Sequence, residues 1–238
     1  MTSKSSDRLG DYTSFTLENI VVALTFFPIA VLIYFYSALP ESIPVFMNLR
    51  GDVEVSAAKS IISVFRVPAM AIDLQLLLLL MKYGTIMSQR KLSSAVNQDY
   101  LKYQGRATLL TARLWDSFRL LGALKMASES VYVVFINDER MDLLWNTVRL
   151  TTWAATLLAI VAAVYFGYRL LMLKREMKGP DTGDQIDKTQ LLAGFIYFNP
   201  DDPAPFVSKY ALNFANKWVY ALLVCIAAYP LLVFSASW

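Results

Sequence analysis

Charged side chains interrupt several hydrophobic stretches of this sequence, and their spacing is the first indication of chemistry. Arg113, Asp116 and Arg119 follow one another at i, i+3 intervals, and Lys125 precedes Glu129 by one helical turn. On a helix such positions are neighbours, so opposite charges can neutralise one another. An unpaired charge in hydrocarbon costs about 2.5 to 3.5 kcal/mol on insertion scales, so these groups need partners or a water-filled cavity.

A further pair of opposite charges lies on an earlier apolar stretch. Arg66 and Asp73 are two helical turns apart and fall near one stripe of a helix. One hypothesis is that Asp73, Asp116 and Glu129 line a polar cavity that binds a ligand, a cation or protons. The other is that the charges are salt bridges and interfacial anchors that fix helix packing, with Arg113 and Lys82 extending toward the membrane surface. The sequence leaves both hypotheses open.

Five hydrophobic segments would position these charges. The first runs from Ile20 to Leu39 without a charged residue, and at about 1.5 Å rise per residue it spans roughly 30 Å, the thickness of a hydrocarbon core. We therefore predict an all-α polytopic membrane bundle, a single domain of residues 1–238 whose 19 N-terminal residues are cytoplasmic. The expected spans are residues 20–39, 61–87, 109–136, 147–173 and 218–234.

The third segment is the most heavily charged, so it has an alternative as an amphipathic helix on the membrane surface. If all five segments cross and the N-terminus is cytoplasmic, most loop Lys and Arg residues face the cytoplasm, whereas Arg50, Lys59 and Arg140 face outside. This distribution agrees with the positive-inside rule. We expect five spans with the C-terminus outside.

Composition excludes several classes of function. The 238 residues include no histidine and one cysteine, Cys225, which lies in the last apolar segment. A zinc, haem or copper site would lack its usual ligands, although an oxygen-only cation site stays open. The sequence has no phosphate-binding loop, nucleophile elbow or dinucleotide fingerprint, so we expect no enzyme, no cofactor and no metal. The net charge of +3 is explained by topology, so we expect no nucleic-acid partner.

The polar stretch LPESIPVFMNLRGDVEVSAAKS follows the first segment and predicts an ordered outside loop. Pro40 and Pro44 disfavour helix, and Asn48 and Gly51 can turn the chain back. We expect the next helix to begin within residues 56–60.

This stretch resembles the signature of a bacterial membrane family of unknown function whose domain is shared with SdpI-type immunity proteins. The matching residues are Pro40, Ile43, Pro44, Asn48, Gly51 and Lys59, and Phe46 stands where the family has histidine. The resemblance implies a multi-pass protein of the bacterial cytoplasmic (inner) membrane. It also implies protection against a secreted killing peptide, or retention of a repressor at the membrane.

A second stretch, YFNPDDPAPFVSKYALNFANKW, is similar to a segment found in the same membrane proteins. The residues that match are Asn199, Pro200, Asp202, Pro203, Phe206, Val207, Lys209, Asn213 and Phe214. The prolines forbid a continuous helix, so we expect a cytoplasmic hairpin with a turn at the prolines, after which SKYALNFANKW resumes a helix that becomes the last span. The turn is either a cap on the bundle or a docking surface for a soluble partner.

Two functions are consistent with these features. The first is a non-enzymatic membrane protein that recognises a peptide, toxin or partner protein, as in immunity or signalling. Its binding residues would be Pro44, Phe46, Asn48, Gly51, Asn199, Asp202, Pro203 and Asn213. The alternative is a small transporter or accessory transport subunit whose pathway is lined by the charges in the membrane. Besides the lipid bilayer and a protein or peptide partner, the pattern also suits an oligomer or a subunit of a larger complex.

Overall fold

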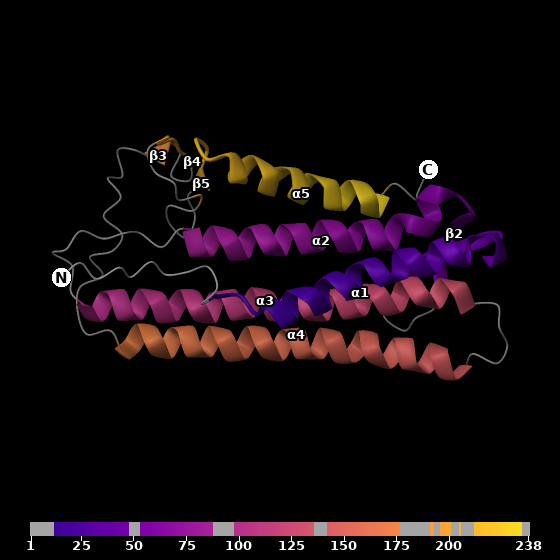
Figure 1. Cartoon of the computed structure of the whole chain (residues 1–238), viewed down its shortest axis with the longest axis horizontal. Coiled ribbons are helices and arrows are strands. Elements are labelled where there is room, and N and C mark those ends of the chain that lie inside the picture. Colours follow the sequence, from indigo (N-terminus) through magenta and orange to yellow (C-terminus); the bar gives the residue numbers. More distant parts are fainter. Residues whose placement is uncertain are drawn as a thin grey trace.

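The computed structural model describes residues 12–47, 53–87, 98–135, 142–176, 191–192, 196–200, 205 and 212–234. Within these ranges the chain forms long helices that lie side by side (Figure 1), so the predicted all-α class is confirmed. The helices are α1 (Phe15–Tyr34), α2 (Ile61–Met87), α3 (Gln98–Phe135), α4 (Asp142–Glu176) and α5 (Lys217–Phe234).

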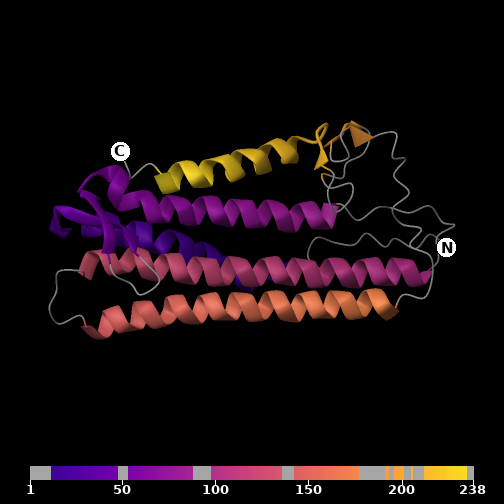
Figure 2. The ribbon, with the colours of Figure 1, turned by 180° about the vertical axis from the view of Figure 1, so that it is seen from behind.

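The central helices of the bundle are α2 and α3, which pack against each other. Helix α1 contacts both of them, whereas α4 packs on the far side of α3 and α5 packs on the far side of α2. Figure 2 shows the same order from behind. Three helices therefore meet at the centre, and two cover it from opposite sides.

Two small sheets lie at opposite ends of the bundle (Figure 1). At one end β1 (Ser42–Met47) pairs antiparallel with β2 (Val53–Ala58) in a hairpin between α1 and α2. At the other end a three-stranded sheet precedes α5. Its strands are β3 (Leu191–Leu192), β4 (Ile196–Tyr197) and β5 (Leu212–Asn213), of which β4 pairs antiparallel with β3 and parallel with β5.

The first helix is shifted by about one and a half turns from the predicted residues 20–39, so that prediction is wrong. The Ser14 Oγ accepts the Leu17 N–H at 3.4 Å and caps the helix at its N-terminus, which Glu18 in the first turn favours electrostatically. The helix ends at Tyr34, and a short 3-10 helix, η2 (Tyr36–Ala38), leads toward the hairpin. The predicted 19-residue cytoplasmic leader therefore includes the first residues of α1.

The second helix spans residues 61–87 as predicted, but residues 56–60 do not begin it, because β2 extends to Ala58. The start is fixed by two serines that cap each other: Ser60 Oγ accepts the Ser63 N–H at 3.1 Å, and Ser63 Oγ accepts the Ser60 N–H at 2.9 Å. Reciprocal capping of this kind ends the strand and starts the helix within a few residues.

The last helix also begins later than SKYALNFANKW suggested. Leu212 and Asn213 form β5, and α5 begins at Lys217 after Asn216, whose Oδ1 accepts the Trp218 N–H at 3.0 Å. Helices α3 and α4 are longer than predicted, by more than two turns at the N-terminal end of α3.

Three helical stretches are long and apolar enough to cross a membrane, namely Phe15–Tyr34, Ile61–Met87 and Asn146–Glu176. The apolar stretch of α5, Lys217–Leu232, is shorter, and the charged α3 does not meet the same criterion. The exposed surface of α4 is strongly apolar. It includes Leu150, Trp153, Leu157, Leu158, Ile160, Val161, Val164 and Leu171. Contiguous apolar surface of this extent is unusual for a monomer in water.

One cluster of buried apolar residues lies where the hairpin meets the helices. Leu32, Leu39, Ile43, Val64 and Val133 form one cluster that joins α1, β1, α2 and α3. Because β1 contributes Ile43, which is 1% exposed, the hairpin is packed into the bundle and does not extend freely from it.

Candidate functional site

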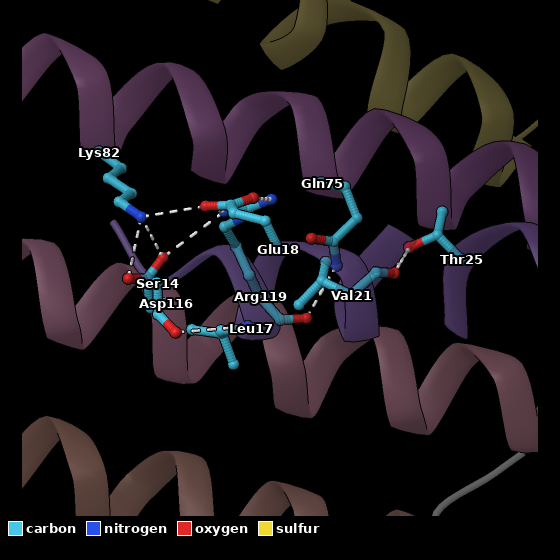
Figure 3. A network of polar contacts seen from close by, with 9 residues as sticks. All are labelled: Ser14, Leu17, Glu18, Val21, Thr25, Gln75, Lys82, Asp116 and Arg119. Carbon is cyan, nitrogen blue, oxygen red and sulfur yellow. Dashed lines mark hydrogen bonds and ion pairs between the residues drawn. The ribbon is translucent and has the colours of Figure 1, made fainter. Parts of the chain in front are cut away.

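Four charged side chains from α1, α2 and α3 meet inside the bundle (Figure 3). The Lys82 ammonium donates to both Asp116 carboxylate oxygens at 2.7 and 2.9 Å, and to Glu18 Oε1 at 3.1 Å. The Arg119 guanidinium binds Glu18 in a bidentate manner, with both N–O distances at 2.8 Å, and its Nη1 lies 3.5 Å from Asp116 Oδ1. We call Glu18, Lys82, Asp116 and Arg119 the charge network.

The charge network is buried and electrically balanced. The side chain of Lys82 is fully buried, those of Arg119 and Asp116 are 4% and 10% exposed, and that of Glu18 is 24% exposed. Two cations face two anions, so the group as a whole carries no net charge. Removing one member would leave an uncompensated buried charge, which costs far more than replacing a pair by neutral groups.

Helix packing rather than spacing along one helix creates the network. Lys82 and Gln75 lie two turns apart on α2, and the Gln75 amide donates to the Arg119 carbonyl oxygen of α3 at 2.9 Å (Figure 3). Gly122 of α3 lies close to Leu74 of α2 in the same interface between the two helices. A Cβ added at Gly122 would lie 3.2 Å from Leu74 Cδ2. The small residue lets the two central helices approach.

A second polar group lies on α2 nearer the hairpin. Arg66 and Asp73 are 6% and 8% exposed, so the prediction that both face the interior is confirmed. Asp73 is close to the thiol of Cys225 on α5, with which its side chain interacts. Within the described residues, no hydrogen-bond partner reaches Arg66 Nε or Asp73 Oδ2.

The other predicted charges of α3 lie farther from the centre. Lys125 and Glu129 form the expected i, i+4 ion pair at 2.8 Å, and both are partly exposed. Arg113 is exposed. The expectation that Lys82 extends toward the membrane surface is wrong, because its ammonium is held between two carboxylates.

The predicted outside loop is the β1–β2 hairpin. Pro44 is buried and pairs with Ser56, and Phe46 pairs with Val55, with irregular register on both sides of Phe46. Asn48 and Gly51 lie outside the described residues. Pro44, one of the predicted binding residues, is therefore buried within the hairpin.

Lys59 connects this hairpin to the segment that follows α1. Its ammonium donates to the Leu39 carbonyl oxygen at 2.9 Å and to the Ser37 carbonyl oxygen at 3.4 Å, and it lies 5.5 Å from the centre of the Tyr36 ring. Its backbone N–H donates to the Glu41 carbonyl oxygen at 2.8 Å. The lysine therefore fixes the base of the hairpin.

The C-terminal stretch places Asn199 beside Asn213. The Asn213 side chain is fully buried; its Oδ1 accepts the Asn199 N–H at 3.1 Å and the Ala215 N–H at 3.2 Å, and its Nδ2 donates to the Asn199 carbonyl oxygen at 3.0 Å. This geometry makes Asn213 a structural clamp of the turn. Asp202 and Pro203 lie outside the described residues.

Three members of the site were not among the candidate site residues, namely Glu18, Lys82 and Gln75, and Lys82 was expected only as an anchor at the membrane surface. Glu18 was assigned to the cytoplasmic leader, although an acidic residue just before an uncharged run is a signal for a helix N-terminus. Gln75 has no comparable sequence signal. Within the described residues, no group of three His, Cys, Asp or Glu side chains could hold a metal ion.

Comparison of the chain with family models, with curated proteins and with solved structures found no match. The resemblance to the SdpI-type family stays a prediction, carried by the two sequence stretches alone.

Proposed function

We propose that this chain is a non-enzymatic integral membrane protein that recognises an extended peptide or protein segment outside the bilayer. Five spans would place the hairpin outside and the β3–β5 sheet in the cytoplasm. The basic residues Lys174 and Arg175 in the last turn of α4 support this orientation, because they lie at the end of the bundle opposite the hairpin.

The observation that carries the proposal is the hairpin, an ordered two-stranded sheet with exposed apolar residues. β2 pairs with β1 and with no other described strand, so its second edge offers backbone donors and acceptors that no described strand uses. Val53 and Val55 on this strand are 42% and 44% exposed. An extended peptide can add to such an edge as a further strand, with its side chains contacting the exposed valines.

The rigidity of the hairpin supports the same proposal. Ile43 lies in the core cluster, Lys59 binds the end of α1, and Ser63 Oγ donates to the Ala58 carbonyl oxygen at 2.8 Å. A binding edge that is already ordered loses little conformational entropy when its ligand binds. Recognition of a secreted peptide, as expected of an immunity or signalling component, would use this edge.

The test is photocrosslinking in intact cells that carry the full chain. A photoreactive amino acid at Val55 should yield adducts with peptides or proteins on the outside, whereas the same group at Trp153 on the apolar face of α4 should yield lipid adducts. Val53→Lys, introduced into the chain that carries the photoreactive group at Val55, places a charge at the edge and should abolish the outside adducts, while Glu41→Gln in the same background, at a fully exposed side chain nearby, should not. Equal adducts from the Val55 probe with and without Val53→Lys would refute recognition through the hairpin.

The transport alternative is favoured by one observation, namely that Arg66 Nε and Asp73 Oδ2 are buried without a hydrogen-bond partner among the described residues. Buried ionisable groups within membrane helices often line ion pathways. Ion flux through proteoliposomes that stops with Asp73→Asn and with Asp116→Asn would select transport. Sensitivity to a secreted toxin on deletion of the gene, without flux, would select immunity.

A further inference from the structure

An apolar groove of about 570 Å³ lies between α2 and α5, on the side of α2 away from the charge network. From α2 it is lined by Leu76, Leu79, Leu80, Tyr83, Gly84 and Met87. From α5 it is lined mainly by Trp218, Val219, Leu222 and Cys225, and Pro205 contributes from the preceding segment. The lining offers almost no hydrogen-bonding groups, so it suits an apolar occupant.

The length of the groove matches one half of a bilayer. Leu76 and Met87 are eleven residues apart on one helix, which at about 1.5 Å per residue corresponds to roughly 16 Å. A hydrocarbon core is about 30 Å thick, so one leaflet contributes about 15 Å. A single acyl chain that runs along the helices would fill this length.

A cation stands at the end of the groove where α5 begins. The Lys217 ammonium lies 5.8 Å from the centre of the Trp218 ring, and Trp218 is itself a lining residue. This end of the bundle carries the β3–β5 sheet and lies opposite the hairpin (Figure 1). A tryptophan with an exposed lysine beside it is typical of the level of lipid headgroups.

We propose that the groove between α2 and α5 binds one acyl chain of an anionic phospholipid of the cytoplasmic leaflet, with the lipid phosphate near Lys217. The proposal rests on the membrane insertion in the proposed function, but not on recognition through the hairpin. A polar ligand would lose its hydrogen bonds to water without replacement.

The test uses the full chain in nanodiscs that contain phosphatidylglycerol and phosphatidylcholine, each with a photoreactive group in the acyl chain. Adducts are mapped by mass spectrometry of peptides. They should concentrate on the lining residues of α2 and α5, and phosphatidylglycerol should dominate there. Adducts spread equally over the outer face of α4 would mean that only unspecific surrounding lipid is present, and would overturn the proposal.

Two matched pairs of variants sharpen the test. Ala221→Phe fills the groove and should reduce adducts there severalfold, whereas Ala154→Phe on the exposed face of α4 should leave them unchanged. Lys217→Ala should lower the preference for phosphatidylglycerol about fivefold, the contribution of one lysine near a membrane surface, whereas Lys174→Ala should not. Unchanged adducts in Ala221→Phe, or an unchanged preference in Lys217→Ala, would contradict the proposed site.

The wild-type adduct map decides the question even if Ala221→Phe fails to insert. Extraction of membranes with alkaline carbonate, scored on the same samples, separates the two proposals. A chain that is released by carbonate refutes membrane insertion, whereas an inserted chain without groove adducts refutes only the lipid site.

Discussion

Replacing Lys82 by methionine tests the charge network most directly. The substitution keeps the length of the apolar stem but removes three hydrogen bonds to carboxylates, at 2.7, 2.9 and 3.1 Å. Asp116 is then left with Arg119 Nη1 at 3.5 Å, and the buried group has a net charge of −1. Breaking a buried ion pair on one side costs about 3 to 5 kcal/mol, so we expect the free energy of unfolding to fall by that amount.

The assay is thermal unfolding of the purified chain in detergent micelles. For a chain of this size each kcal/mol shifts the unfolding midpoint by about 2 to 4 °C, so Lys82→Met should lower the midpoint by roughly 6 to 20 °C. Lys125→Met is the control, because it removes a partly exposed i, i+4 pair with Glu129 and should cost about 0.3 to 0.5 kcal/mol.

A double variant separates the charge effect from lost packing. Lys82→Met combined with Asp116→Asn removes one cation and one anion, so the remaining Glu18 and Arg119 still balance. The double variant should be more stable than Lys82→Met alone, with a coupling energy of about 2 kcal/mol or more. If Lys82→Met destabilises no more than Lys125→Met, or if the double variant is the less stable one, the buried ionised network is refuted.

Three further predictions concern other parts of the bundle. Lys59→Met removes the bond to the Leu39 carbonyl oxygen, so amide hydrogen exchange in β2 should become about tenfold faster while that of α3 stays unchanged. Asn213→Ala leaves buried backbone groups unpaired at a cost of about 1 to 3 kcal/mol, so limited proteolysis between α4 and α5 should accelerate; unchanged cleavage would contradict the clamp. Gly122→Val should destabilise by about 1 to 3 kcal/mol, whereas Gly105→Val, whose added Cβ meets nothing within 4 Å, should not.

The sequence predicted the helices well where hydrophobicity alone decides, and less well where local hydrogen bonds decide. The apolar run of α2 was predicted at about residues 61–87 because it is largely apolar, although the helix was expected to begin within residues 56–60, which β2 and the two residues after it occupy. The predicted start of α1 was too late in the chain. Ser14 caps a first turn that contains the charged Glu18, and a prediction based on uncharged apolar residues alone leaves that turn out of the helix. The two strands of the hairpin were not predicted, because the stretch was expected to be a loop. VEVSA nevertheless alternates apolar and polar residues over a few positions, as a strand does.

The partners of the buried charges could be predicted only in part. Spacing along one helix gave Lys125 and Glu129 correctly, because an i, i+4 pair needs nothing but the helix. The main partner of Asp116 is Lys82 on another helix, and Glu18 comes from a third. Such pairs depend on which helix faces pack together, which the spacing within each helix does not specify.

The same ion pairs bear on the choice between recognition and transport. A cation that reached Asp116 between α2 and α3 would have to displace the Lys82 ammonium. Separating a buried ion pair costs about 3 to 5 kcal/mol, unless the cation takes over all the interactions of the ammonium with Asp116. A peptide that adds to the β2 edge separates no buried charge, and it meets a strand that Lys59 and Ile43 already hold in place. The charge network therefore favours recognition over a cation pathway through Asp116. Measurable flux that disappears with Asp116→Asn would reverse this preference.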